Sequence, residues 1–440
     1  MATTRPERPR IRPVEVIPFE EAGKRSFLLQ DPAGYVESPL QLSPAALLLV
    51  GLCDGSRTPD EVRADFASRA GHALSAEELA GFLETMDRAL LLDSPSFQAH
   101  RAQHEQEFAA LEWRPASHAG TAYEGDPARL GSALDRWLAG GVAGGRAGDR
   151  LRALLAPHID FHRGGAGYGK AYAALIDRET PEVVVLLGTG HAAEEGRFIL
   201  CDKGFRTARG DLPVDRDFLG RLERRLARSH RRGLFAHRRE HSIEFQAVWL
   251  AHLFSSEPRP AIVPILGTTF DDLFEEGAGP TRHPETGDFL GALRETWREE
   301  RRRVLVVVGA DLAHVGPRFG DAQPNTPEFL AEVRARDAAA LDGAKSGSAD
   351  RFLAAVAEHR NRHRICSVAG IFAALHTVRA DGGDLLAYEQ AVDPSGQLAV
   401  TFAGMALYGG VDGPGLARTR PLKRALRQGT TPPRRNGPRP

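Results

Sequence analysis

The stretch 304-VLVVVGADLAH-314 decides the fold class of this chain. Its run of aliphatic residues does not alternate with polar ones, which is typical of a strand covered on both faces of a sheet. Residues 183–187 (VVVLL) repeat the pattern, and segments with helical periodicity lie between such runs. The sequence therefore predicts an α/β fold with a covered central sheet.

The same reasoning, extended in both directions from this stretch, gives the expected elements of one large domain over about residues 115–412. We predict strands at Leu151–Ala156, Val183–Leu187, Phe198–Cys201, Ala261–Leu266, Val304–Val308, Leu385–Ala391 and Ala399–Leu407. We predict helices at Ala166–Ile176, Arg216–Arg228, Ser242–Phe254, Glu285–Glu300, Pro327–Asp342 and Ser367–Arg379.

Three histidines follow predicted buried strands by a few residues. His158 follows LRALLAP, His191 follows VVVLLGTG, and His314 follows VLVVVGADLA. In open α/β sheets, ligands bind in the crevice at the carboxyl ends of the strands. One such histidine is more often a surface or packing residue, but three in equivalent places predict a shared site.

Cys366 is the cysteine whose position in the sequence suggests a chemical role. It precedes the predicted helix Ser367–Arg379, and a helix N-terminus favours the thiolate form needed for metal ligation or nucleophilic attack. Cys53 and Cys201 lie in apolar segments and are expected to be inert core residues. Three widely spaced cysteines form no disulfide framework, so we expect a reduced, cytoplasmic location.

The segment 240-EHSIE-244 begins another predicted helix. It lacks the second histidine of a zinc-protease helix, so His241 is expected to face substrate or orient a ligand. The alternative interpretation is that this segment only caps the helix and that His241 lies on the surface without a functional role. Asp311, three residues before His314, is placed to orient an imidazole or relay a proton. His241, Asp311 and His314 are thus the catalytic candidates.

Composition limits the classes of partner. The formal net charge is −1, which gives no electrostatic reason to bind nucleic acid or an anionic membrane. No apolar run reaches the roughly 18 residues of a spanning helix, and the N-terminus has no apolar core of a signal peptide. Residues 1–13 and the basic, proline-rich residues 413–440 are expected to be disordered, and residues 99–114 are expected to form a linker.

Residues 14–98 are predicted to form a separate small module. Val14–Phe19 and Ser26–Gln30 suggest a hairpin, followed by helices that begin after Ser43, Thr58 and Ser75. The closing apolar segment Leu90–Asp93 is predicted as a strand. In LSPAALLLVGLCDGSRTPDEV and DRALLLD the module resembles the PqqD-like winged-helix domains, which implies a peptide ligand. A structural cap on the larger domain is an equally good interpretation.

The larger domain resembles the Memo family, also known as protein B of the AmmeMemoRadiSam system. The resemblance rests on ASHAGTAY (116–123), APH (156–158), LLGTGH (186–191), EHSIE (240–244), VVVGADLAHVG (306–316) and ICSVAG (365–370). It implies a fold similar to the class III extradiol dioxygenases, whose iron is held by two histidines and a carboxylate. A cysteine stands in the place of that carboxylate in Memo proteins.

The resemblance further implies a ligand set and partners. His158, His191 and Cys366 match the metal ligands. His314 matches the nearby histidine that acts as acid/base in the dioxygenases, and Asp311 matches the neighbour of that histidine. A divalent metal is expected, iron(II) or copper ahead of zinc, together with a radical-SAM protein and an AMMECR-type protein as partners. The neighbours differ from the family pattern: Ile159-Asp160-Phe161 follows the first histidine, and Ser367 follows Cys366.

Two functional hypotheses follow. The first is a metal-dependent redox enzyme, or a subunit of one, that acts with a radical-SAM partner; a site of two nitrogens and a thiolate leaves positions open for substrate. The alternative is a non-catalytic peptide-binding or adaptor protein with a vestigial metal site.

Overall fold

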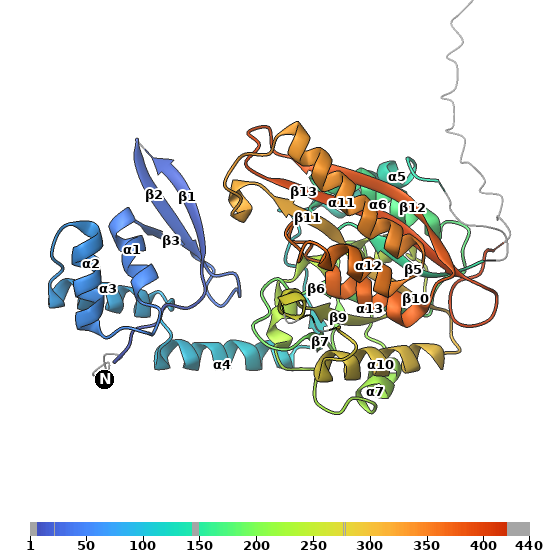
Figure 1. Ribbon diagram of the computed structural model, residues 1–440. Coiled ribbons are helices and arrows are strands. Elements are labelled where there is room, and N and C mark those ends of the chain that lie inside the picture. The colour runs from blue at the N-terminus through green and yellow to red at the C-terminus, as the bar shows by residue number, and fades with distance from the viewer. Residues whose placement is uncertain (1–6, 22, 143–148, 276, 278, 420–440) are drawn as a thin grey trace, which may run out of the picture.

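The computed structural model describes residues 7–21, 23–142, 149–275, 277 and 279–419, and a small N-terminal module stands beside a larger domain (Figure 1). The module contains β1 (Glu15–Glu21), β2 (Lys24–Gln30), β3 (Leu40–Leu42), α1 (Pro44–Leu52), α2 (Pro59–Ala70) and α3 (Ala76–Arg88). Its strands form one antiparallel sheet in the order β1-β2-β3. The predicted hairpin is present.

The helices of the module begin where the sequence predicts. The side chains of Ser43, Thr58 and Ser75 each accept a hydrogen bond from a backbone N–H in the first turn, and Thr58 and Ser75 take part in full capping boxes. Val62 of α2 and Met86 of α3 are fully buried in a core shared with β2. The module therefore has its own hydrophobic core.

Three sequence expectations for the N-terminal part differ from the structure. Leu90–Asp93 is not a strand, because Leu92 makes only an isolated bridge to Ile11. Of residues 1–13, which are predicted to be disordered, residues 1–6 lie outside the described residues. In the described part Ile11 is buried, and its backbone N–H donates to the carbonyl of Cys53 at 2.8 Å, so this part is held against the module. The predicted linker 99–114 is mostly helix α4 (Pro95–Ala110), which begins at the cap residue Ser94.

The larger domain contains a long series of alternating strands and helices. Its strands are β4 (Trp113–Arg114), β5 (Arg150–Ala156), β6 (Val183–Thr189), β7 (Phe198–Leu200), β8 (Gly204–Phe205), β9 (Ala261–Gly267), β10 (Val304–Gly309), β11 (Asp311–Val315), β12 (Gly382–Val392) and β13 (Ala399–Gly409). Its helices are α5 (Pro127–Leu138), α6 (Phe161–Tyr172), α7 (Arg216–Glu223), α8 (His241–Leu253), α9 (Asp271–Glu275), α10 (Pro284–Arg298), α11 (Pro327–Lys345), α12 (Ala349–Ala357) and α13 (Val368–Val378). Short 3₁₀ turns η1 (Ala173–Leu175), η2 (Leu234–Arg238) and η3 (Pro317–Phe319) complete the domain.

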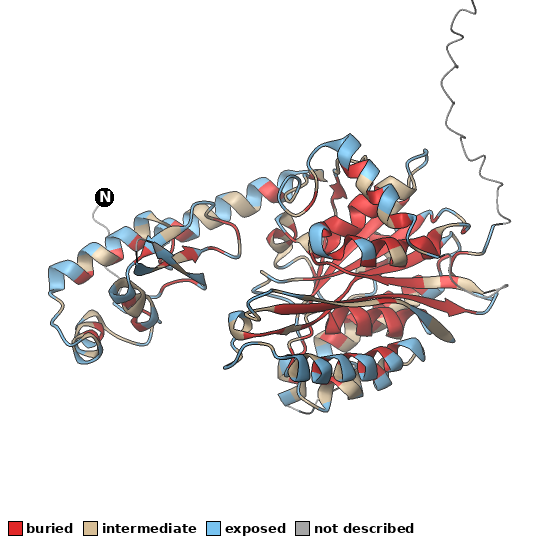
Figure 2. Cartoon of the chain, turned by 90° about the horizontal axis from the view of Figure 1, so that it is seen from above, coloured by how far each residue is buried: buried red, intermediate tan, exposed pale blue. Residues whose placement is uncertain are grey.

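The central sheet has the order β11-β13-β5-β10-β6-β9-β7, with β12 paired to β13. Strands β5, β10, β6 and β9 are parallel, whereas β13 and β7 run antiparallel to their neighbours. Helices cover both faces, which are buried throughout the middle of the sheet (Figure 2). The predicted α/β class is confirmed.

Successive residues of the central strands point into two different cores. Val306 and Val308 of β10 pack with α7, α10, α11, α12 and α13, whereas Leu305 and Val307 pack with α5, α6 and α8. All four side chains are fully buried. This two-sided burial explains why the strand is aliphatic without alternation.

The C-terminal side of the domain also differs from expectation. Asp311 and His314 lie in a short strand, β11, rather than in a loop after β10. Residues 413–419 are described, and Leu416 is fully buried and pairs with Leu151, so the predicted disorder does not begin at 413. The rest of the predicted tail, 420–440, lies outside the described residues. Among the helices that are described, none is long and apolar enough to cross a membrane.

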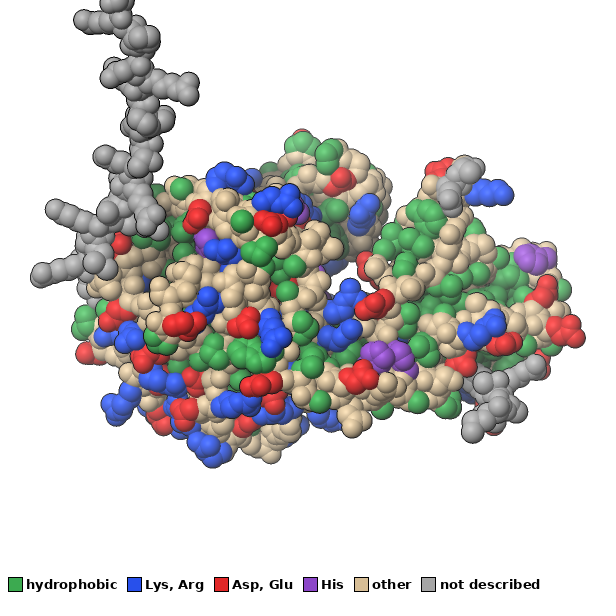
Figure 3. Space-filling view, turned by 180° about the vertical axis from the view of Figure 1, so that it is seen from behind, with side chains coloured by type: hydrophobic (Ala, Val, Ile, Leu, Met, Phe, Trp, Pro, Cys, Tyr) green, Lys and Arg blue, Asp and Glu red, His purple; other side chains and the backbone are tan. Residues whose placement is uncertain are grey.

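The N-terminal module contacts the larger domain through α4 and the loop after β2. Tyr35 of that loop stacks on Phe235 of η2, with ring centroids 4.5 Å apart, and both rings belong to a small buried cluster with Phe97 and Phe108. Arg101 of α4 lies 3.4 Å from the carboxylate of Glu194. A hollow remains between the two lobes beyond these contacts (Figure 3).

Candidate metal centre

The parallel strands bring two of the predicted ligands to one edge of the sheet. β5 ends at Ala156, two residues before His158, and β6 ends at Thr189, two residues before His191. Strand β10 pairs in parallel with both, so the ends of β5 and β6 lie at the same edge. The imidazole centroids of His158 and His191 are 5.2 Å apart. His158 and His191 therefore meet at the sheet edge where the sequence predicts a shared site.

His158 is buried, and Asp311 contacts both its backbone and its ring. Its N–H donates to Oδ1 of Asp311 at 2.7 Å, and its ring Nε2 lies 3.8 Å from Oδ2 of the same carboxylate. The other ring nitrogen, Nδ1, is buried without a hydrogen-bond partner among the described residues. A buried polar atom without a partner is costly, and ligand-binding sites are one place where it is tolerated.

His191 is oriented by Glu240, a residue that the sequence reasoning did not single out. Nδ1 of His191 donates to Oε1 of Glu240 at 3.0 Å, and the backbone N–H of His191 donates to Oε2 at 3.1 Å. Burial alone disfavours the carboxylate, but the two neighbouring imidazoles, His191 and His241, hold the pKa of Glu240 well below its ordinary range. The position of Glu240 directly before His241 is the sequence feature that could have indicated its role.

His241 lies closer to the predicted ligands than a purely substrate-facing role requires. One ring nitrogen from each of His158, His191 and His241 falls within 4.8 Å of the other two. The rings of His191 and His241 are stacked, with centroids 4.7 Å apart. Their side chains are 35% and 33% exposed, so one side of the cluster is open to solvent.

Helix α8 reaches this position because two glycines leave room for it. A Cβ at Gly188 would lie 2.5 Å from the side chain of Ile243, and one at Gly309 would lie 2.4 Å from the carbonyl oxygen of Ser242. Ser242 also hydrogen-bonds with the backbone of Thr189 at the end of β6. The N-terminus of α8 is thereby fixed against the ends of β6 and β10.

Cys366 joins the cluster from another part of the chain. It precedes Ser367, the cap residue of α13, and its Sγ lies 3.3 Å from Nε2 of His158. Burial alone raises a thiol's pKa, but His158 and His191 outweigh it and lower the pKa of Cys366 to about 7. Burial raises the pKa of Cys53 to about 11 and that of Cys201 to about 12. Only Cys366 of the three cysteines is primed to ionise.

Asp311 and His314 both lie on β11, beside the histidine cluster. Burial raises the pKa of Asp311 to about 6, against the opposing effects of His314 and the backbone N–H of His158. Burial also lowers the pKa of His314, whose Nδ1 hydrogen-bonds with the carbonyl of Leu312 at 3.0 Å. Burial thus favours the neutral form of both side chains: the raised pKa of Asp311 favours its protonated carboxyl, and the lowered pKa of His314 favours its neutral imidazole. Groups with such shifted pKa values are suited to proton transfer.

A fully buried ion pair supports the site from outside. Arg114 Nη1 lies 2.5 Å from Oε2 of Glu244, and neither side chain is exposed. Glu244 also accepts hydrogen bonds from the backbone of Ser117 and His118 and from the hydroxyl of Tyr123. The 116–123 motif is thus fastened to α8, and its residues lie beside the cluster rather than in it.

The donor set fits a transition metal. Two imidazoles and a thiolate that ionises near neutrality are ligands preferred by iron, copper and zinc. The carboxylate that orients His191 is the usual outer partner of a metal-bound histidine. His158, His191 and Cys366 are the residues that would hold such an ion, and the structure brings all three together.

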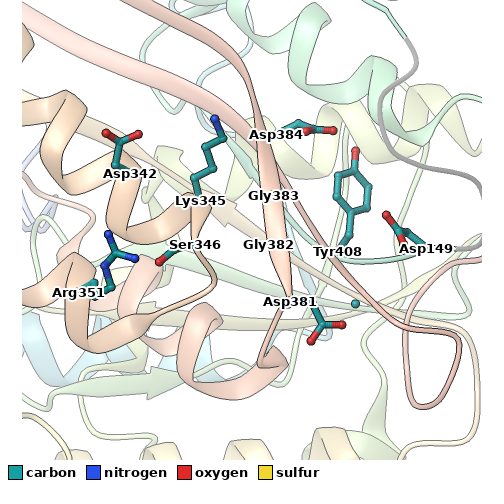
Figure 4. A pocket seen from close by; sticks show the side chains of 11 residues that line it. Asp149, Asp342, Lys345, Ser346, Arg351, Asp381, Gly382, Gly383, Asp384 and Tyr408 are labelled. Carbon is teal, nitrogen blue, oxygen red and sulfur yellow. The ribbon is translucent and has the colours of Figure 1, made fainter.

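A separate pocket on the same domain is lined by none of these residues. It has a volume of about 610 Å³ and is lined by charged side chains and glycines of the helix α11 and strand β12–β13 region (Figure 4). Lys345 and Arg351 face Asp381 and Asp384 across it. It is separate from the histidine cluster.

Comparison with known proteins identifies the family of this chain. Residues 114–406 match the family model of Memo-like proteins. A MEMO1 family protein of Aquifex aeolicus is 26% identical over 91% of this chain and 100% of its own length. A MEMO1 family protein of Thermus thermophilus is 29% identical over 76% of this chain and 93% of its own length. The memo-1 homolog of Caenorhabditis elegans is 31% identical over 47% of this chain and 54% of its own length. Because the family model spans more than half of the chain, this protein belongs to the Memo family.

Proposed function

We propose that this Memo-family protein is a metal-dependent redox enzyme, or the metal-carrying subunit of one, with His158, His191 and Cys366 as ligands. The observation that carries the proposal is the 3.3 Å distance between Sγ of Cys366 and Nε2 of His158 at the carboxyl ends of the parallel strands. Iron(II) or copper is the expected metal, because a thiolate with imidazoles suits both and the family resemblance favours a redox ion over zinc.

The bound ion would supply redox chemistry and attraction for a substrate oxygen, and the surrounding residues have separate tasks. Asp311 holds the backbone of His158 through its 2.7 Å hydrogen bond. His314 is the proposed proton donor or acceptor, because burial lowers its pKa while the neighbouring buried carboxyl of Asp311 opposes that change. Substrate enters along the exposed edges of His191 and His241.

The N-terminal module supports a second proposal, peptide binding. Strand β1 is an edge strand whose Val16 and Ile17 are 39% and 36% exposed, and such an edge accepts an added strand. A groove of about 340 Å³ lies between Phe27 of β2 and Leu47 and Leu48 of α1. The peptide would be a substrate or an anchor for the metal site, or the ligand of an adaptor whose metal site is vestigial.

The proposed cellular setting follows the family resemblance: a cytoplasmic protein that works with a radical-SAM protein and an AMMECR-type protein. Co-purification with such partners tests the setting. Elemental analysis of protein purified without oxygen or chelator tests the redox proposal. Iron or copper as the main metal is expected, and zinc alone would contradict redox chemistry while leaving the ligand set intact.

A further inference from the structure

The carboxylate of Glu240 contacts two imidazoles of the cluster at once. Its Oε1 lies 3.0 Å from Nδ1 of His191 and 3.3 Å from Nδ1 of His241. Both contacts use the same ring nitrogen of each histidine. No other acidic side chain touches either ring among the described residues.

Glu240 is itself held rigidly. Its side chain is 3% exposed, and it accepts hydrogen bonds from the backbone N–H of His191 at 3.1 Å and of Ser242 at 2.9 Å. It is also the cap residue of α8, where the positive end of the helix dipole favours a carboxylate. These contacts hold the carboxylate of Glu240 in place between the two imidazoles.

These contacts decide which nitrogen of each ring is available. An ionised carboxylate only accepts hydrogen bonds, so the nitrogen facing it must carry a proton. Nδ1 is therefore the nitrogen that keeps its proton in both His191 and His241, and Nε2 is the nitrogen that can offer a lone pair to a metal. A metal ligand needs that lone pair, and a hydrogen-bonded Nδ1 is the usual way proteins secure it.

We infer that Glu240 is a positioning residue that prepares His191 and His241 together, and that His241 is a metal ligand beside His158 and His191. The 4.8 Å grouping of one nitrogen from each ring supports this assignment. It rests on the proposed metal site and adds a ligand to it. It replaces the substrate-facing role that the sequence favours for His241.

The first arm of the test needs no metal. Histidine ¹⁵N chemical shifts of the metal-free full-length protein report which nitrogen of each ring is protonated. At a pH high enough for both rings to be neutral, we expect the proton of His191 and of His241 on Nδ1, and loss of that preference in at least one of them in Glu240→Gln. Unchanged protonation of both rings in Glu240→Gln would show that Glu240 does not position them.

The second arm uses Zn²⁺ alone as the probe, because it is diamagnetic and binds the same donors. We expect Nε2 of His158, His191 and His241 to shift together on titration, and Glu240→Gln and His241→Gln each to weaken Zn²⁺ binding about 10–100-fold. His252→Gln is the matched control, since His252 lies on the same helix but pairs with Asp135; its affinity should not change.

The outcomes separate this inference from the proposed function. Shifts of His158 and His191 without His241, or wild-type Zn²⁺ affinity in His241→Gln, would overturn the ligand assignment and leave the metal site standing. No Zn²⁺ binding by the wild-type protein would overturn the proposed metal site and the ligand role of His241 with it. The metal-free arm would still decide whether Glu240 positions the two rings.

Discussion

Sγ of Cys366 lies 3.3 Å from Nε2 of His158, although 208 residues separate them in the chain. The contact joins the end of β5 to the residue before the cap of α13. It brings a sulfur atom and an imidazole nitrogen from distant parts of the chain together in the site.

The ionisation of Cys366 can be tested directly. Its pKa is lowered to about 7, so the thiolate fraction of the metal-free protein should rise through one half near neutral pH. Alkylation by iodoacetamide, followed by mass spectrometry across pH 5–10, should show Cys366 reacting with a midpoint near 7. Cys53 and Cys201, which are buried, should remain unmodified. A midpoint for Cys366 near the ordinary value of 9 would contradict the proposed influence of the two histidines.

His314 is expected to be dispensable for metal and necessary for proton transfer. His314→Ala should keep its metal, whereas dioxygen consumption by the iron(II)-loaded protein supplied with ascorbate should fall by roughly 100-fold. Asp311→Asn, which keeps the volume of the side chain, should be intermediate. If His314→Ala loses metal as fully as His158→Ala, then His314 is a ligand and not an acid/base group.

The buried Arg114–Glu244 pair is expected to dominate the acid sensitivity of the fold. Burial opposes ionisation of Glu244, but Arg114 and the Tyr123 hydroxyl lower its pKa to about 2. A carboxyl whose pKa is lower in the folded state stabilises the fold above the unfolded value near 4.5. This contribution, about 3 kcal/mol, should be lost as the pH falls from about 4.5 to 2.

Glu244→Gln isolates this contribution from other titrating groups. It leaves the Arg114 charge buried without a counter-ion, so the free energy of unfolding at pH 7 should fall by about 3–5 kcal/mol. Arg129→Gln, which breaks the more exposed contact with Glu124, should change it by less than about 1 kcal/mol. Equal effects of the two substitutions in chemical denaturation would remove the special role of the buried pair.

The contact between the N-terminal module and the larger domain is predicted to depend on Tyr35. Tyr35→Ala removes the stack on Phe235 and the hydrogen bond to Glu105, so backbone amides of η2 should exchange hydrogen faster. Tyr35→Phe keeps the stack and loses only the hydrogen bond, and should resemble the wild type. Unchanged exchange in Tyr35→Ala would mean that α4 alone holds the two parts together.

Local patterns in the sequence predict the centre of this fold well, because its strands are buried on both faces. The aliphatic runs at 183–187 and 304–308 become β6 and β10, and their burial leaves no room for polar residues. The helix starts at Thr58 and Ser75 can also be predicted from the sequence, because a capping box depends on two residues only three positions apart. Parallel pairing then brings His158 and His191 to one edge.

The parts that could not be predicted depend on distant contacts. Ile11 and Leu416 sit in polar, proline-rich surroundings, yet each pairs with a buried segment far away in the chain. Strand β11 exists because Asp311 and His314 pair with β13, which lies more than 80 residues later. Glu240 contacts His191, which lies 49 residues earlier in the chain, so this contact becomes visible only in the folded structure.

The most direct test of the central claim is the metal content of the three ligand variants. His158→Ala, His191→Ala and Cys366→Ala should each be purified without oxygen or chelator and analysed beside the wild type and His252→Gln. We predict about one metal ion per chain in the wild type and the control, and a loss of most of it in each ligand variant. Metal content near that of the wild type in all three ligand variants would contradict the site.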